Sequence, residues 1–157
     1  MKRVLVANLV CSIALCGLHP VQAADLCTGI KLALGSAEDH FRSLRGKFDF
    51  TIHGYKSKVT FGYLSVCRVS GDSAMAEIEC SVGIAQEQSV DAVWRKAVYD
   101  TKLCLGSDIE EQEGGLPNFA DFNYLPTGDD IEIVKQYLDP PGIYIVGMTI
   151  TTIDPTK

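Results

Sequence analysis

Four cysteines in the body of the chain have the clearest chemistry of any side chains in the sequence. They stand at Cys27, Cys67, Cys80 and Cys104, separated by 40, 13 and 24 positions. A zinc site usually contains closely spaced pairs such as C-x-x-C, which this spacing lacks. An even number of dispersed cysteines is instead typical of disulfides in an exported protein. The sequence therefore predicts two disulfides and no metal site.

Two histidines, His40 and His53, are the next candidates for chemistry. Neither belongs to a metal-binding pattern such as H-E-x-x-H, and cysteines held in disulfides cannot act as nucleophiles. The G-x-S-x-G elbow and the P-loop pattern are also absent from the sequence. We expect no enzymatic activity and no cofactor. The alternative is a small hydrolase that combines carboxylates with one of these histidines.

Acidic and aromatic side chains gather in residues 107–130, a stretch without a clear helical or strand period. A connection of this length is either mobile or functional. Its acidic pairs, Glu110/Glu111 and Asp129/Asp130, lack the spacing of a calcium-binding loop. We expect an irregular acidic loop that offers a binding surface. The candidate binding residues are Asp108, Glu110, Glu111, Glu113, Phe119, Phe122 and Tyr124.

The first 23 residues have the pattern of a secretory signal peptide. Basic residues precede a mostly apolar stretch at 4–18, and Val21 and Ala23 place small side chains before a cleavage site. The apolar stretch is shorter than the roughly 20 residues of a membrane-spanning helix. Lipid attachment at Cys16 is disfavoured because Leu15 precedes it. We expect cleavage after residue 23, a periplasmic or extracellular location and no stable membrane insertion.

Residues 24–157 are enough for a single domain with a hydrophobic core. They contain 12 Lys and Arg against 20 Asp and Glu, which gives a net charge of −8. A domain this acidic lacks the basic surface that nucleic acid or an anionic membrane requires. The composition therefore favours a protein partner with a basic surface and excludes nucleic acid.

Hydrophobic periodicity predicts amphipathic helices over residues 24–45 and 88–105. Alternation of apolar and polar residues predicts strands over 48–52, 58–69, 74–82, 131–138 and 143–153. The predicted order is α-β-β-β-α-β-β. With both helices on one face of an antiparallel sheet, this order predicts a two-layer α+β sandwich that the disulfides staple.

The strand pattern also predicts which cysteines pair. A turn at residues 70–73 places Val69 opposite Ala74, and this register leaves Cys67 and Cys80 four positions apart along their strands. That separation is roughly 13 Å, whereas a disulfide spans at most about 7 Å between Cα atoms. Each strand cysteine is then expected to bond to a helix over the sheet. Chain direction predicts the pairs Cys27–Cys80 and Cys67–Cys104.

The sequence leaves several functions open. Export, small size, disulfides and the lack of a catalytic pattern favour a small binding protein, such as an inhibitor, an immunity-type protein or an adaptor. It would contact a protein through the 107–130 segment and the adjoining strands, where Leu64 and Val66 need cover. The alternatives are the small envelope hydrolase, an envelope stress or structural protein without enzymatic activity, and a small-molecule binder that uses Phe119, Phe122 and Tyr124.

Overall fold

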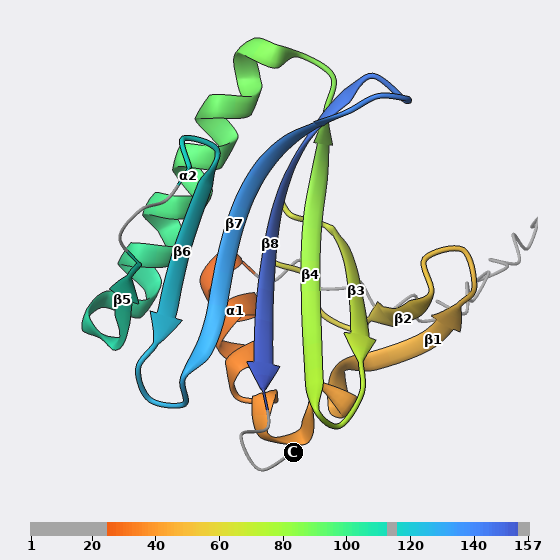
Figure 1. The fold of residues 1–157 in the computed structure, drawn as a ribbon, viewed down its shortest axis with the longest axis vertical. Coiled ribbons are helices and arrows are strands. Elements are labelled where there is room, and N and C mark those ends of the chain that lie inside the picture. The colour runs from red at the N-terminus through yellow and green to blue at the C-terminus, as the bar shows by residue number, and fades with distance from the viewer. Residues whose placement is uncertain (1–24, 113–115, 154–157) are drawn as a thin grey trace, which may run out of the picture.

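A computed structural model describes residues 25–112 and 116–153 of the chain. This part of the chain forms two α-helices and one antiparallel sheet of eight strands (Figure 1). The predicted signal peptide, residues 1–23, lies outside the described residues. The helices are α1 (Leu26–Leu34) and α2 (Glu87–Leu105). The strands are β1 (Arg45–Asp49), β2 (Gly54–Ser57), β3 (Val66–Gly71), β4 (Met75–Ile84), β5 (Ile109–Glu111), β6 (Phe119–Tyr124), β7 (Asp129–Leu138) and β8 (Ile143–Ile153).

The strand order in the sheet is β1-β2-β3-β4-β8-β7-β6-β5. The first four strands are neighbours in chain order, and the last four follow in reverse, so that β8 pairs with β4 in the middle of the sheet. Both helices lie behind the sheet in Figure 1. The predicted α+β class with an antiparallel sheet is confirmed. The element order differs from the prediction, because four strands precede α2 and four follow it.

One side of the sheet carries the hydrophobic core. Ile78 in β4, Ile131 in β7 and Met148 in β8 have no exposed surface. Successive side chains of a strand point to opposite faces, so the buried residues in the middle of β4 and β7 lie at every second position. α2 packs on the same side, where the indole N–H of Trp94 donates a 3.2 Å hydrogen bond to the Ile133 carbonyl. The buried face therefore holds the sheet and the helices together.

The first helix is shorter than the sequence pattern predicts. α1 ends at Leu34, and two 3₁₀ turns separate it from β1. His40 and Phe41, between these turns, have left-handed φ angles of 54° and 56°. Such angles interrupt a right-handed helix, although the apolar spacing of the segment continues through it.

The segment between β2 and β3 is a buried loop, although the alternation predicts a strand there. β3 begins only at Val66, and Phe61 and Leu64 in the loop are fully buried. α1 crosses this loop closely, because a Cβ atom on Gly29 would lie 2.4 Å from the Thr60 carbonyl oxygen. The absence of a side chain at Gly29 therefore allows the helix to pack on the loop.

The disulfides join the four predicted cysteines, but in other pairs than predicted. Cys67 and Cys80 are directly opposite each other in β3 and β4 and form a disulfide with a Cα–Cα distance of 4.1 Å. Cys27 in α1 bonds to Cys104 near the end of α2, at a Cα–Cα distance of 5.3 Å. Four cysteines do form two disulfides, but the predicted Cys27–Cys80 and Cys67–Cys104 pairs are wrong.

The error lies in the position of the β3–β4 turn. Gly71 pairs with Ala76 and has a φ of 89°, a left-handed angle that glycine adopts at little cost. Asp72 follows, and its Oδ1 accepts a hydrogen bond of 2.7 Å from a backbone N–H of the turn. The turn lies two residues later in the chain than predicted, and this shift places Cys67 opposite Cys80. Because an even shift keeps every side chain on its own face, the alternation is the same in both registers.

The segment 107–130, predicted to be an irregular acidic loop, contains β5 and β6 and the start of β7. β5 pairs with β6, and β6 pairs with β7. Within β6, Phe122 is fully buried while its neighbours Asp121 and Asn123 are half-buried on the other face. The alternation is hard to recognise because Phe119, an aromatic residue, shares the face of Asp121.

α2 and the last two strands agree closely with the sequence pattern. α2 begins at Glu87 and ends at Leu105, where Gly106 provides the C-cap with a φ of 56°. In the β7–β8 hairpin, Leu138 pairs with Ile143, which is the predicted register. Tyr137 and Tyr144 consequently lie side by side, with ring centres 5.0 Å apart.

Candidate functional site

The sheet has a second face that neither α1 nor α2 covers, and this open face is turned toward the viewer in Figure 1. Its side chains alternate with the core residues of β4, β6, β7 and β8. Acidic residues occupy the middle of the face, and all of them are half-buried. The half-buried carboxylates of the open face are Glu77, Glu79, Asp121, Asp130 and Glu132.

These carboxylates form two neighbouring rows across the sheet. In one row Asp121 pairs with Glu132, and a threonine of β8 separates Glu132 from Glu79. In the other row a second threonine of β8 separates Asp130 from Glu77. Adjacent strands lie about 4.8 Å apart, so the rows extend over roughly 15 Å of the sheet. Like charges directly opposite each other destabilise an antiparallel pair, which makes Asp121 and Glu132 an unfavourable pair.

Burial and the crowding of carboxylates on the open face raise the pKa of two of these carboxylates. Burial raises the pKa of Glu132, and the charges of Asp121 and Asp130 raise it further. Burial also raises the pKa of Asp121, as does Asp130, against the lowering effect of a backbone hydrogen bond at Phe122. The Oδ1 atom of Asp121 is buried and has no hydrogen-bond partner within residues 25–112 and 116–153. A cation brought to this face would stabilise the charged form of both carboxylates.

Arg68 of β3 is the one cation that pairs with these carboxylates in the described part of the chain. Its Nη2 lies 2.6 Å from Oε2 of Glu79, and its Nε donates a 2.7 Å hydrogen bond to the same oxygen. The other four carboxylates form no ion pair with a described lysine or arginine. The open face therefore keeps an excess of negative charge.

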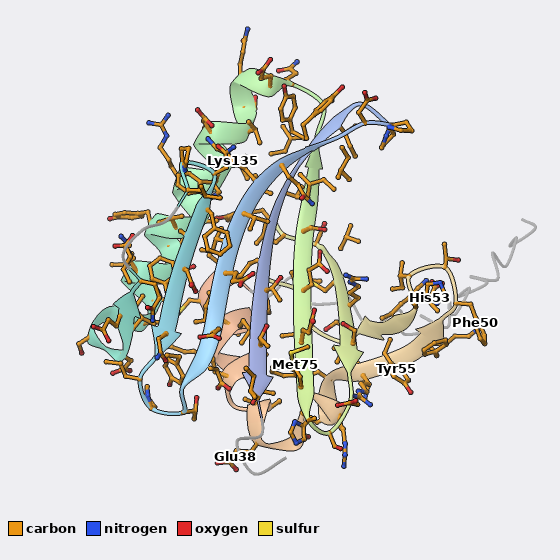
Figure 2. All side chains as sticks on the ribbon, viewed as in Figure 1. Glu38, Phe50, His53, Tyr55, Met75 and Lys135 are labelled. Atoms are coloured by element: carbon orange, nitrogen blue, oxygen red, sulfur yellow. A yellow bond between two sulfur atoms is a disulfide. The ribbon has the colours of Figure 1, made fainter. Side chains whose placement is uncertain are left out.

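A groove of about 560 Å³ lies at the border of the open face. It is lined by β3 and β4, by the turn between β1 and β2, and by the β7–β8 hairpin. Figure 2 labels His53, which belongs to the lining, at the β1–β2 turn. Val66 is 70% exposed, although it is an apolar strand residue. The apolar residues of the lining include Ile52, Val66, Leu138 and Ile145, and Arg68 and Glu79 also belong to it.

Some of the predicted binding residues lie on or near the open face. Glu110 is in register with Asn123, and Phe119 is in register with Val134, so both point to this side of the sheet. Asp108 is exposed in the 3₁₀ turn that follows α2. Glu113 lies outside the described residues. Glu110 therefore extends the row of Asp130 toward the β5 edge, whereas Phe119 lies outside both acidic rows.

Other predicted binding residues lie on the opposite side of the sheet. Phe122 is fully buried, and Tyr124 is partly buried against the core. Glu111 forms an ion pair with Lys102 of α2 at 2.7 Å, and the same ammonium lies 5.6 Å from the centre of the Phe122 ring. The structure therefore does not bring the seven predicted residues together on one surface.

A second pocket, of about 270 Å³, lies between α2 and the β7–β8 hairpin. Lys135, labelled in Figure 2, forms an ion pair with Asp91 and lies 5.1 Å from the centre of the Trp94 ring. The hydrogen bond from Lys135 holds the pKa of Asp91 below its usual value. Tyr137 and Tyr144 complete the pocket. Because Lys135 and Asp91 neutralise each other, this pocket offers a ligand no unpaired charge from either side chain.

Neither histidine forms an ion pair with a carboxylate among residues 25–112 and 116–153. His40 is half-buried between two 3₁₀ turns, and its Nδ1 has no hydrogen-bond partner among the described residues. His53 is exposed in the β1–β2 turn. In the described ranges no group of three or more His, Cys, Asp or Glu side chains could hold a metal ion. His53 lines the groove at the border of the open face together with Glu79.

Asp121, Asp130 and Glu132 were not among the binding residues predicted from the sequence. Acidic residues alternate with apolar residues in β4, at Glu77 and Glu79, and also in β7. It indicates a strand with an acidic outer face. What the pattern does not contain is the insertion of β8 between β4 and β7, which places the acidic strands beside the same strand.

Comparisons with known proteins give no match. No family model matches the chain, and neither a curated protein nor a solved structure does. Among the described helices none is both long enough and apolar enough to cross a membrane. What the chain does must therefore follow from the chemistry of its own residues.

Proposed function

We propose that the protein is an exported binding protein whose open face contacts a basic surface of a partner protein. The observation that carries the proposal is that four of the five half-buried carboxylates on the open face have no cationic partner among the described residues. An inhibitor, an immunity-type protein or an adaptor would use such a face without catalysing a reaction. In this arrangement the helices form one layer and the sheet the other, which leaves the second face of the sheet to the partner.

Export is part of the same proposal. The pattern of residues 1–23 supports a secretory signal. The disulfides Cys27–Cys104 and Cys67–Cys80 support it as well, because such bonds persist in oxidising compartments. We expect the partner to be found in the periplasm or outside the cell.

Charge complementarity supports a basic partner. Lysines or arginines of a partner would relieve the repulsion between Asp121, Asp130 and Glu132. Near a protein surface the effective dielectric constant is about 20, so such contacts are stronger than in water. Complementary charges also increase the association rate and disfavour acidic competitors. The open face is therefore suited to selecting a basic protein.

Charge reversal on the open face tests the proposal. Glu132→Lys places a cation opposite Asp121, so we expect the variant to fold at least as well as the unmodified chain. Glu38→Lys changes the net charge equally and serves as the control, since Glu38 is exposed in the 3₁₀ turn after α1 (Figure 2). The probe is a synthetic oligoarginine peptide, and its affinity is measured by isothermal titration calorimetry at low salt.

The expected result is that Glu132→Lys weakens binding about tenfold, because it changes the local charge by two units and each is worth about 1 kcal/mol at 4 Å in water before screening. Glu38→Lys should change the affinity much less. Equal losses in the two variants would show that only net charge matters, and this outcome would overturn the proposal. Unchanged binding in Glu132→Lys would overturn it too.

A further inference from the structure

The groove and the acidic rows of the open face share one border. Glu79 lines the groove and also ends one of the carboxylate rows, where it pairs with Arg68 at 2.6 Å. Apolar side chains form part of the groove lining, and Val66 among them is 70% exposed. Apolar surface that polar side chains surround is typical of protein contact sites. A partner that covers the carboxylates is therefore close enough to fill the groove.

Strand geometry gives the spacing between the groove and the unpaired carboxylates. Glu77 is two residues from Glu79 along β4, a distance of about 7 Å. Glu132 is two strands away from Glu79, at about 10 Å, and Asp121 is one strand further, at about 14 Å. An extended peptide advances about 3.3 Å per residue. These carboxylates are thus within reach of side chains about two to four residues from a side chain held in the groove.

We propose that the partner inserts one apolar side chain into the groove and lays basic side chains, about two to four residues away in an extended segment, on the carboxylate rows. This inference rests on the proposed function and specifies the partner as a basic segment with an apolar anchor. The groove volume of about 560 Å³ lies within the range of pockets that hold small ligands, so it accommodates one side chain. Burial of the apolar anchor in the groove contributes affinity, and the basic side chains orient the segment on the carboxylates.

Two synthetic peptides and one groove-filling variant test the anchor. Both peptides carry the same three arginines, spaced to follow the carboxylate rows. One peptide has a leucine two residues before the first arginine, and the other has glycine in its place. Ser81→Phe fills the groove from β4, at a half-buried position on the open face. Phenylalanine is favoured in strands, and the neighbouring Gly147 has no side chain to obstruct the ring.

Two further variants complete the experiment. Gln88→Phe adds the same ring to the exposed surface of α2 and controls for a nonspecific effect of added apolar surface. Val66→Thr replaces one methyl group of the groove by a hydroxyl group at a largely exposed position, so it tests the same contact without a change of volume. Affinities are measured by calorimetry, and circular dichroism verifies that each variant is folded.

The leucine peptide should bind the unmodified chain about tenfold more tightly than the glycine peptide, the lower end of what burial of one leucine contributes. Ser81→Phe should abolish this advantage without changing the affinity for the glycine peptide. Val66→Thr should reduce the advantage, and Gln88→Phe should preserve it. These results together would support the apolar anchor.

Different outcomes separate this inference from the proposed function. Equal affinities of the two peptides for the unmodified chain, or a leucine advantage that persists in Ser81→Phe, would overturn the anchor while the acidic contact stands. Glycine-peptide binding that does not respond to Glu132→Lys would overturn the proposed function. If neither peptide binds the unmodified chain, both proposals are wrong.

Discussion

The two disulfides should contribute unequally to the free energy of unfolding. Cys27–Cys104 joins residues 77 positions apart, and Cys67–Cys80 joins residues 13 positions apart. A cross-link restricts the unfolded chain by an amount that increases with the logarithm of the closed loop. The loop lengths give about 4.5 kcal/mol for the first bond and about 3 kcal/mol for the second. Because the long loop contains the short one, a closed Cys67–Cys80 bond lowers the first value only slightly, to about 4.3 kcal/mol.

The positions of the bonds in the fold lead to the same order. Cys67 and Cys80 lie in a hairpin of six residue pairs. These pairs keep the strands in register whether or not the disulfide is formed. Cys27 and Cys104 lie at the start of α1 and near the end of α2, two helices that are not held together by a strand ladder. Removal of Cys27–Cys104 should therefore cost more stability than removal of Cys67–Cys80.

The assay compares Cys27→Ala/Cys104→Ala with Cys67→Ala/Cys80→Ala in urea, followed by the fluorescence of Trp94. Alanine avoids an unpaired hydroxyl group at Cys80, which is fully buried. We expect losses of about 4 and about 3 kcal/mol, with a larger increase in the m-value for the long loop, because its unfolded state expands more. A larger loss for Cys67→Ala/Cys80→Ala would refute the reasoning from loop length.

The other predictions concern the open face and the packing of α1. Glu132→Gln should stabilise the protein by about 0.2–1 kcal/mol at neutral pH, because it removes the charge opposite Asp121. Since the folded state raises the pKa of Glu132 above its usual value of 4.5, the gain should shrink as the pH falls through this raised pKa and vanish below 4.5, where Glu132 is protonated and as uncharged as Gln; urea melts at neutral and acidic pH check this, and a gain that grows in acid would contradict it. Gly29→Ala should destabilise the protein by about 1–3 kcal/mol, because the new Cβ would lie 2.4 Å from the Thr60 carbonyl oxygen. Thermal unfolding against the control Gly83→Ala, whose Cβ meets nothing closer than 3.5 Å, measures this effect, and equal melting temperatures would contradict it.

Local sequence patterns predicted α2 and the β7–β8 hairpin. α2 has a sustained apolar stripe and a glycine at its end, so its bounds agree with the sequence to within one residue. The β7–β8 register follows from the short turn between Leu138 and Ile143 and the alternation on either side. The two disulfides follow from the number and spacing of the cysteines, although their pairing does not.

The sequence did not predict the register of the β3–β4 hairpin, because the alternation of apolar and polar residues is the same in both registers. Cys67 keeps its face whether it is opposite Ala76 or Cys80, so only the φ of Gly71 and the hydrogen bond to Asp72 select the true register. Asp121, the carboxylate of β6, lies in a segment where Phe119 hides the alternation of apolar and polar residues. The alternation of apolar and polar residues alone could not distinguish the two registers.

The candidate site was partly visible in the sequence. Glu77 and Glu79 mark an acidic outer face on β4, and Val66 stands out as an apolar residue that needs cover. Phe122 was a reasonable candidate for ligand contact, but only the packing of α2 over β6 and β7 shows that it is buried. The acidic rows depend on a long-range strand pairing, which no local window contains.

The pairing of β4 with β8 also has a consequence for how the sheet is made. Every other neighbouring pair in the sheet joins strands that follow one another in the chain, whereas α2, β5, β6 and β7 separate β4 from β8. Contacts this distant in sequence slow folding, because a large loop must close before they form. Until β8 arrives, β4 presents an unpaired edge that can accept a strand from another molecule. The complete sheet therefore forms only when β8 pairs with β4 in its middle.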